Sequence, residues 1–143
     1  MITFRSLTAA ALLVGALTFN AQAQVAAPAE EALIRATVQT YFDGWAVGDS
    51  AKVSSAMHPS CHLKLLRNGE FVAISKRDYI AGFKPRAKGD TQGRILALHQ
   101  TGHAAGVVSQ ITSGPNRYTD YFNLLKVNGR WYITDKVAYR QDL

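Results

Sequence analysis

Cysteine is almost absent from this chain, because Cys61 is the one cysteine among 143 residues. A single thiol excludes an intramolecular disulfide, even in an oxidising compartment. We expect Cys61 to be a buried, inert thiol, with an intermolecular bridge as the alternative. The chain also lacks a Gly-rich phosphate loop, a Ser-His-Asp elbow and a Cys-x-x-Cys pair. None of these signatures therefore points to phosphate binding, serine hydrolysis or thiol redox chemistry.

Long apolar runs are scarce, and the one that is present lies at the N-terminus. Arg5 is followed by an apolar run over residues 7–19 and then by Ala21-Gln22-Ala23, which is typical of a secretory signal peptide cleaved after Ala23. The run is too short to span a bilayer as a mature helix. We therefore expect residues 1–23 to be a signal peptide. Residues 24–143 would then form a periplasmic or secreted protein with no membrane partner.

Acidic residues are fewer than basic ones, 10 against 16, which gives a net charge of +6. Many of the cations lie between Lys76 and Arg94. They could form an anion-attracting rim of a pocket or simply a solvated loop and helix face. Aromatic residues are not interleaved with these cations, and an exported protein seldom meets nucleic acid, so we expect no nucleic-acid partner.

Histidines number four, and their spacing argues against a metal site. Pro59 separates His58 from His62, while His99 and His103 flank a predicted turn. Neither pair has helical i, i+4 geometry with an acidic third ligand nearby. We expect solvated or capping histidines, with no metal and no cofactor.

The mature chain has the length of one domain with one core. A long amphipathic helix is predicted from about Glu30-Glu31, where negative charge favours a helix start, to Gly48. Its apolar stripe has helical spacing and comprises Ile34, Val38, Tyr41 and Trp45. Asp49 can cap a second, shorter helix that runs to about Met57.

A short hairpin and a third helix are predicted next. Asn68-Gly69 forms a turn between two apolar runs, and residues 75–78, Ser-Lys-Arg-Asp, have the spacing of a capping box. The box opens a helix that buries Tyr79, and strand-like runs at 94–100 and 104–112 follow. This order predicts an α+β domain, with helices covering one face of a curved antiparallel sheet.

The last hairpin, residues 117–140, turns at Asn128-Gly129, which suits a type I′ turn that pairs Val127 with Arg130. Strict alternation then places nine side chains on one face: Tyr118, Asp120, Phe122, Leu124, Trp131, Ile133, Asp135, Val137 and Tyr139. The two aspartates would be diagonal neighbours, roughly 7 Å apart. Either this face lines a pocket, or the assigned face or register is wrong.

The order of elements and several strings resemble the nuclear transport factor 2-like superfamily, which includes ketosteroid isomerases, scytalone dehydratase and SnoaL-like polyketide cyclases. The strings are Tyr41-Phe42-Asp43-Gly44-Trp45, Gly48-Asp49, Met57-His58-Pro59, Asp120-Tyr121-Phe122-Asn123-Leu124-Leu125-Lys126 and Asn128-Gly129-Arg130-Trp131. They are similar to an exported group labelled "putative lumazine-binding". The resemblance implies a cone-shaped fold with three N-terminal helices packed on a curved antiparallel sheet. The sheet would curl around a pocket lined by the Asp120 and Asp135 face.

Ketosteroid isomerase uses an Asp base with an oxyanion hole made of a Tyr and a protonated Asp. The resemblance places Tyr41 and Asp120 at the two oxyanion-hole positions, whereas Leu65 stands where the general base is expected. Asp135 could substitute as a base, because two carboxylates in an apolar site cannot both ionise cheaply. Alternatively, the carboxylates bond to backbone or tyrosine hydroxyls, or a bulge turns one outward. Whether the protein is an enzyme therefore stays open.

Three hypotheses follow. In the first, the protein binds a small molecule such as a planar heterocycle in a conical pocket lined by Tyr41, Trp45, Tyr118, Asp120, Phe122, Trp131, Asp135 and Tyr139. In the second, Tyr41, Asp120 and Asp135 are the catalytic candidates of a lyase, isomerase or cyclase. In the third, it is a homodimeric interaction module whose contact surface is the outer face of the sheet, with Tyr121, Leu125, Val127 and Tyr132.

Overall fold

The computed structural model describes residues 21–143, with side chains from residue 28 onward, so most of the predicted signal peptide lies outside the described residues. The first helices are α1 (Ala21–Val47) and α2 (Ser50–Ala56). Next come β1 (His62–Arg67), β2 (Glu70–Ser75) and α3 (Lys76–Ala81). The four longest strands follow: β3 (Gln92–Thr101), β4 (Ala104–Ser113), β5 (Asn116–Val127) and β6 (Arg130–Asp142). This is the predicted α+β order.

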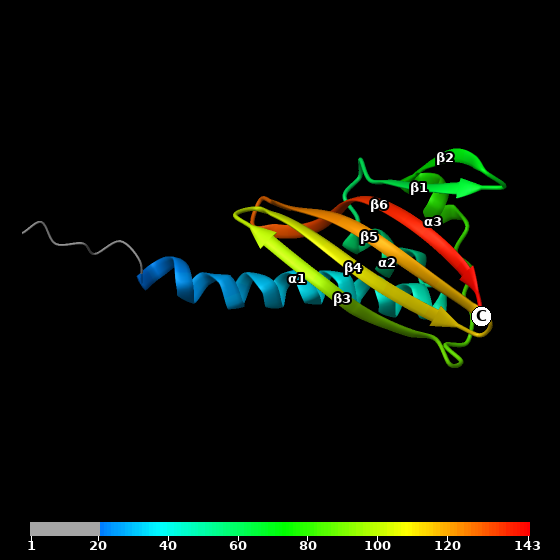
Figure 1. Cartoon of the computed structure of the whole chain (residues 1–143), viewed down its shortest axis with the longest axis horizontal. Coiled ribbons are helices and arrows are strands. Elements are labelled where there is room, and N and C mark those ends of the chain that lie inside the picture. Colours follow the sequence, from blue (N-terminus) through cyan, green and yellow to red (C-terminus); the bar gives the residue numbers. More distant parts are fainter. Residues whose placement is uncertain (1–20) are drawn as a thin grey trace, which may run out of the picture.

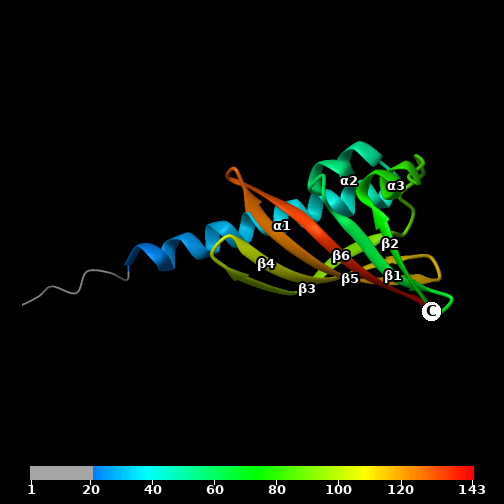
Figure 2. The same ribbon diagram turned by 90° about the horizontal axis from the view of Figure 1, so that it is seen from above.

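All six strands form one sheet in the order β2-β1-β6-β5-β4-β3, and α1 runs along one face of it (Figures 1 and 2). Every pairing is antiparallel except that of β1 with β6, which is parallel. That pairing comprises only Leu63 with Lys136 and Lys64 with Val137. The sheet is therefore mixed, and the prediction of a wholly antiparallel sheet was wrong at this one pairing, which joins strands far apart in sequence.

The helices differ from the prediction in two respects. Three are present, but α2 has 7 residues and α3 has 6. Helix α3 follows the first hairpin, as the capping box predicted, so only α1 and α2 precede the sheet, whereas the resemblance implied three N-terminal helices. Helix α1 begins at Ala21, well before the predicted start at Glu30. The Glu30 carboxylate instead accepts hydrogen bonds from Lys126 Nζ and Trp131 Nε1, which ties the helix to the final hairpin.

The predicted helix ends are confirmed by their contacts. Gly48 has φ +68°, and a Cβ at this position would lie 1.9 Å from the Lys84 carbonyl oxygen, so only glycine fits. The Asp49 side chain caps α2 by accepting the backbone N–H of Lys52. In the same way, the Ser75 hydroxyl caps α3.

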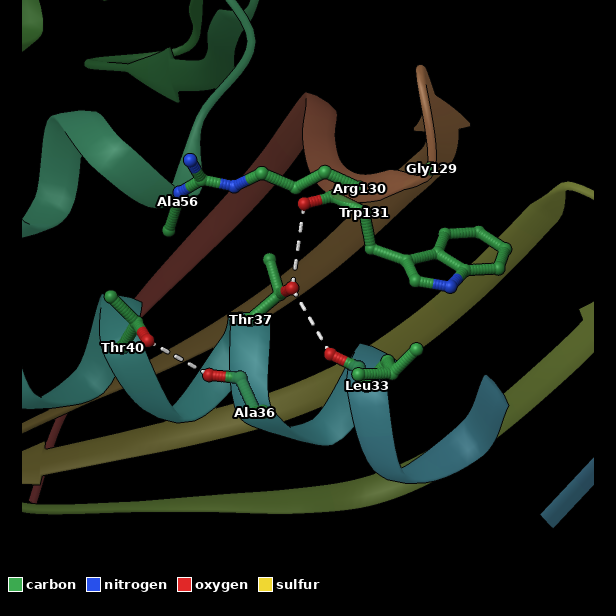
Figure 3. Close-up of a pocket in the computed structure, with 8 residues that line it drawn as sticks. All are labelled: Leu33, Ala36, Thr37, Thr40, Ala56, Gly129, Arg130 and Trp131. Carbon is green, nitrogen blue, oxygen red and sulfur yellow. Dashed lines mark hydrogen bonds between the residues drawn. The ribbon is translucent and has the colours of Figure 1, made fainter. Parts of the chain in front are cut away.

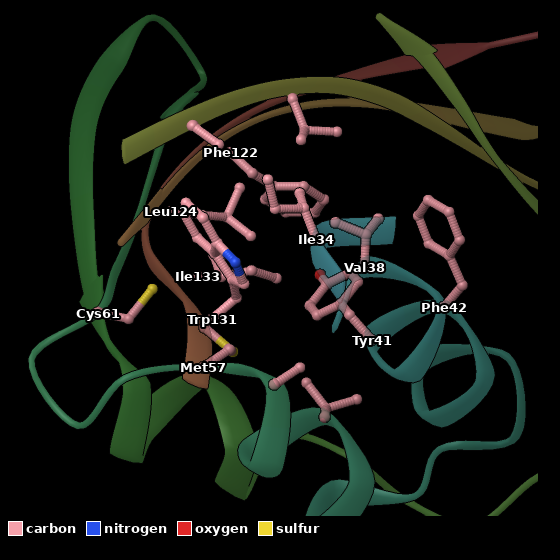
Figure 4. Packing of buried hydrophobic residues seen from close by; sticks show 14 of the residues in the cluster. Ile34, Val38, Tyr41, Phe42, Met57, Cys61, Phe122, Leu124, Trp131 and Ile133 are labelled. Atoms are coloured by element: carbon pink, nitrogen blue, oxygen red, sulfur yellow. The ribbon is translucent and has the colours of Figure 1, made fainter. Parts of the chain in front are cut away.

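The core fills the space between α1 and the long strands (Figure 4). Its largest fully buried apolar side chains are Trp131, Tyr41, Phe122, Ile34, Met57, Ile111, Leu124, Ile133, Val38, Val53 and Val107. Cys61 belongs to this core, as predicted for an inert thiol. Burial raises the pKa of its thiol to about 11, so the reactive thiolate is disfavoured.

The final hairpin contains a β-bulge that changes which side chains point inward. The predicted turn is confirmed, because Val127 pairs with Arg130. The register then holds as far as Leu124 with Ile133, but Asn123 pairs with Asp135, which leaves Thr134 as an extra residue. Beyond the bulge the inward residues of β6 are Lys136, Ala138 and Arg140. The prediction that Asp135, Val137 and Tyr139 share the face of Asp120 was therefore wrong.

Two cations of the basic segment between Lys76 and Arg94 close helix ends. Lys76 Nζ donates to the Met57 carbonyl after α2 at 2.7 Å, and the Arg86 guanidinium donates to the Trp45 carbonyl in the last turn of α1. Cations are favourable at these negative helix ends. Among residues 21–143, no helix is long and apolar enough to cross a membrane.

Candidate functional site

A buried ion pair lies under the inward face of the sheet, just beyond the bulge. Lys136 on β6 and Asp120 on β5 are 4% and 0% exposed, and Lys136 Nζ lies 3.0 Å from Asp120 Oδ2. Beyond this ion pair, neither Asp120 oxygen has a hydrogen-bond donor among the described residues. Ser109, directly across from Asp120 on β4, also has an unpartnered buried hydroxyl.

Burial and mutual attraction act in opposite directions on this pair. Burial raises the pKa of Asp120 above its ordinary value, and Lys136 opposes that shift. Burial by itself lowers the pKa of Lys136, but the Asp120 carboxylate and the Tyr79 hydroxyl outweigh it, so the pKa of Lys136 is raised. At pH values between the two pKa values, Asp120 is ionised and Lys136 is protonated. Each charge then compensates the other, whereas either charge alone would be buried without a partner.

Tyr41 and Tyr79 extend this pair into a polar cluster. Lys136 Nζ donates to the Tyr41 hydroxyl at 2.6 Å, and the hydroxyl oxygens of Tyr41 and Tyr79 are also 2.6 Å apart. Tyr41 comes from the buried face of α1, whereas Tyr79 comes from α3 and is half-buried. Burial raises the pKa of Tyr41 well above its ordinary value, so this phenol stays protonated.

A cleft of about 640 Å³ opens beside this cluster, where β1 separates from β6 after only two residue pairs. Its volume lies in the range of ligand pockets in proteins. Aromatic and aliphatic side chains dominate its walls, which consist of Trp45, Leu63, Leu65, Leu66, Phe71, Tyr79, Tyr118, Val137, Ala138 and Tyr139. Three cationic residues, Lys64, Lys136 and Arg140, complete the lining, and no carboxylate is among the described lining residues.

The eight residues predicted to line a pocket lie in different parts of the structure. Trp45, Tyr118 and Tyr139 line the cleft. Tyr41, Phe122 and Trp131 are packed in the core, as Figure 4 shows, so the centre of the cone is filled with side chains and is not open. Asp120 lies beneath the cleft beside Lys136, and Asp135 lies on the opposite face of β6.

Asp135 is paired with a different cation. Its Oδ2 accepts from Lys64 Nζ at 2.8 Å, and the two side chains are 25% and 39% exposed. The Thr134 hydroxyl holds the bulge by donating to the Asn123 carbonyl at 3.0 Å, and the bulge turns Asp135 away from Asp120. The two carboxylates therefore do not share a cavity, which corrects the expectation that they form an acid–base pair.

The cleft contains no arrangement that matches the isomerase comparison. Leu65, at the position of the missing base, is one of its apolar walls. Tyr41 bonds to Lys136 and Tyr79 and is fully buried, so it reaches no open space. Residues Tyr41, Asp120 and Asp135 thus do not converge on one reaction centre.

Two residues of the site were not identified from the sequence. Strict alternation placed Lys136 on the solvent side, and Tyr79 was predicted only as a buried residue of the third helix. A lysine within an aromatic, apolar strand was the one available signal. It became meaningful only once the bulge had reversed the phase of β6.

A second hollow, of about 260 Å³, lies between α1 and the start of β6 (Figure 3). Its hydroxyls are already used, because Thr37 Oγ1 donates to the Leu33 and Trp131 carbonyls and Thr40 Oγ1 donates to Ala36. Among the described residues, no group of three His, Cys, Asp or Glu side chains could hold a metal ion.

Solved structures share this fold. A nuclear transport factor 2-like protein of unknown function from Silicibacter pomeroyi is 21% identical, with a TM-score of 0.74 over 80% of this chain and 98% of its own. A second one, from Shewanella baltica, is 22% identical, with a TM-score of 0.72 over 80% and 95%. A ketosteroid isomerase-like protein from Erwinia carotovora atroseptica is 19% identical, with a TM-score of 0.63 over 78% and 96%. At these identities the similarity establishes the fold alone.

No curated protein matches the chain. The family described as "Putative lumazine-binding" matches residues 29–139, which include α1 from its third turn onward and almost all of the sheet. The predicted resemblance is therefore confirmed. The chain belongs to the "Putative lumazine-binding" family and has the nuclear transport factor 2-like fold.

Proposed function

We propose that this protein binds a small molecule in the cleft between β1 and β6. The observation that carries the proposal is the cleft itself, which has about 640 Å³ of space, apolar walls and a buried ammonium at its inner end. Ligand sites in proteins are typically apolar pockets of this size with a few convergent polar groups. The family description, which names lumazine, agrees with a small-molecule ligand.

The lining favours a planar heterocycle that is neutral or anionic. Trp45 and Tyr118 offer aromatic faces, with ring centroids 5.2 Å apart and planes tilted by 59°. Such rings bind flat ligands well. Lys64, Lys136 and Arg140 line the cleft, whereas the aspartates that pair with them are not among its described lining residues, so a cationic ligand would meet the cations first.

The test begins with native mass spectrometry of the protein purified from its own host, to detect a retained small molecule. Lumazine, pterin and riboflavin are then added separately and the melting temperature is measured. A bound heterocycle at about 100 times its Kd should stabilise the fold by about 2.7 kcal/mol. An empty protein that none of these heterocycles stabilises would contradict the proposal.

A matched pair of variants localises the ligand. Leu65→Trp fills the cleft that Leu65 lines, so it should weaken binding of the retained molecule or of the best heterocycle at least tenfold. Leu96→Trp adds the same volume on β3, where Leu96 is 48% exposed and outside the cleft, and should leave binding unchanged. Equal effects of both substitutions would place the ligand elsewhere.

Self-association through the outer face of the sheet is a second proposal, carried by exposed apolar residues there. Tyr121, Leu125 and Val137 are 53%, 45% and 45% exposed, and Tyr121 pairs directly with Val137 across the two strands. The bulge places Val137 on this face. Light scattering should find a dimer that Tyr121→Asp dissociates, whereas a monomeric wild type would end this proposal.

Export is the third element of the proposal, and it rests on the sequence of residues 1–23. In the native host, the full chain should be found outside the cytoplasm with residues 1–23 removed. A chain starting at residue 24 should stay inside. Intact mass and cell fractionation measure both outcomes, and a full-length cytoplasmic protein would contradict export.

A further inference from the structure

A row of polar groups leads from the protein interior to the wall of the cleft. It begins at Lys136 Nζ, continues through the Tyr41 hydroxyl at 2.6 Å and ends at the Tyr79 hydroxyl another 2.6 Å away. Tyr41 is wholly buried, whereas Tyr79 is half-buried and lines the cleft. The outermost hydroxyl of the row is therefore the one beside the open space.

The chemistry of the groups fixes the direction of the bond between Lys136 and Tyr41, and it favours one direction for the bond between Tyr41 and Tyr79. An ammonium can only donate, so the Tyr41 oxygen accepts from Lys136 and the Tyr41 proton remains available for another acceptor. The Tyr79 oxygen is the acceptor within reach. Tyr79 then keeps its own proton, and no other described side chain accepts that proton in a hydrogen bond. That proton is available to a group in the cleft.

The buried cation strengthens the outermost donor. Chains of hydrogen bonds polarise one another in a low-dielectric interior, and charge-assisted bonds are the stronger ones. Lys136 is held firmly, because Asp120 lies 3.0 Å away and the Tyr41 and Tyr79 rings have their centroids 5.1 and 5.3 Å from Nζ. Its raised pKa keeps it charged, and the raised pKa of Tyr41 keeps that phenol a donor.

From this geometry we infer that Tyr79 recognises an oxygen acceptor of the ligand, and that Lys136 acts through Tyr41 as the positioning and polarising residue for that donor. The ligand class is a planar molecule bearing a carbonyl oxygen or an ionisable enolic or phenolic oxygen. Aromatic walls at Trp45 and Tyr118 hold the ring system while Tyr79 binds the oxygen. This inference rests on the proposed function, because it assigns a role within the same cleft.

Two probes separate recognition of the oxygen from binding of the rings. Naphthalene and 2-naphthol have the same bicyclic skeleton, and only 2-naphthol carries an ionisable oxygen. Calorimetry gives the affinity of each probe, and the absorption spectrum of bound 2-naphthol, recorded as a function of pH, gives its pKa. In the wild type, the donor should lower the pKa of bound 2-naphthol below its value in water, because it stabilises the naphtholate.

The decisive variant is Tyr79→Phe, which removes one hydroxyl and keeps the ring. It should weaken 2-naphthol binding about tenfold or more, leave naphthalene binding unchanged and reduce the pKa shift of the bound naphthol. Tyr132→Phe is the matched control, because Tyr132 is also a half-buried tyrosine but lies outside the cleft beside His58. Lys136→Gln should reduce the naphthol pKa shift while Tyr79 is retained, provided circular dichroism shows a folded chain.

The outcomes distinguish this inference from the proposed function. If both probes bind and Tyr79→Phe changes neither the affinity for 2-naphthol nor its pKa, the inference is overturned and the cleft remains a binding site. An equal loss in Tyr132→Phe would overturn it as well. If neither probe binds the wild type, the cleft proposal fails and the inference fails with it. Should Lys136→Gln not fold, the Tyr79→Phe comparison decides alone.

Discussion

The inward face of β5 and β6 has two halves that differ in character. Toward the turn, Leu124, Trp131 and Ile133 are at most 2% exposed and pack against α1. Beyond the bulge at Thr134, the same face presents the Asp120–Lys136 pair, and β1 leaves β6 to open the cleft. One continuous hairpin therefore supplies a closed core at one end and the base of a binding site at the other.

This difference shows how a single extra residue can divide a sheet into a stabilising and a functional part. Bulges bend strands and re-aim side chains. Here the bulge lies where the Ile133 carbonyl accepts the His58 N–H and where Met57 bridges to β6. The segment after α2 is attached at that point, and the β1–β2 hairpin extends from it (Figure 2). Residues of this hairpin line one side of the cleft.

The largest effect is expected at the closed end. Trp131→Ala removes a side chain that is 2% exposed and breaks its hydrogen bond to Glu30, so unfolding should become easier by about 5 kcal/mol. Tyr139→Ala, at a position that is 66% exposed, should change stability by less than about 0.5 kcal/mol. Urea denaturation measures both. Similar losses at the two positions would remove the distinction between core and cleft.

Breaking the buried ion pair between Lys136 and Asp120 should lower the free energy of unfolding somewhat less than Trp131→Ala does. Lys136→Met leaves the Asp120 charge without compensation and should destabilise the fold by about 3 kcal/mol. Adding Asp120→Leu to that variant should restore most of the loss, because an apolar pair needs no compensation. Lys64→Met, which breaks the half-exposed pair with Asp135, should cost no more than about 1 kcal/mol. The same urea series decides, and a double variant as unstable as the single one would refute the pairing.

Alkaline pH should lower the free energy of unfolding, because three buried groups lose their protons. The folded-state pKa values of Cys61, Tyr41 and Lys136 all lie above their ordinary values of 9.0, 10.0 and 10.5. Each group therefore contributes stability that is complete below its ordinary pKa and is lost as the pH rises through its folded pKa. For Cys61 that window runs from 9.0 to about 11. Cys61→Ala should flatten the fall in unfolding free energy across that window, and an unchanged slope would contradict the assignment.

The smallest effect concerns the attachment of the cleft wall. Lys76→Met removes the hydrogen bond from Nζ to the Met57 carbonyl and should cost about 1 kcal/mol. Arg77→Met removes a neighbouring cation whose side chain is 89% exposed, and should be close to neutral. Thermal denaturation of the pair measures the difference. Equal stabilities would mean that Lys76 does not hold α2 to α3.

Local residue chemistry made much of the fold predictable. Asn128-Gly129 favours one turn type, and this fixed the hairpin register as far as Leu124. Asp49 and Ser75 cap helices through bonds to residues three positions away, so their roles are visible in short strings. The family resemblance then supplied the α+β architecture. The site was predicted less completely than the fold. Trp45, Tyr118 and Tyr139 were expected at a pocket, whereas Tyr79 and Lys136 were not.

The sequence by itself determined the elements that depend on neighbouring residues: the amphipathic α1, the helix caps and the two Asn-Gly turns. Only the tertiary structure decided which way the end of β6 faces. Its two phases are locally similar, and the choice depends on distant partners: Lys136 bonds to Tyr41, which is 95 residues away in sequence, and Asp135 to Lys64, 71 residues away. Burial of the Lys136 ammonium is tolerated only where Asp120 and Tyr41 are positioned to compensate its charge and accept its hydrogen bond. A local sequence pattern cannot show these distant partners.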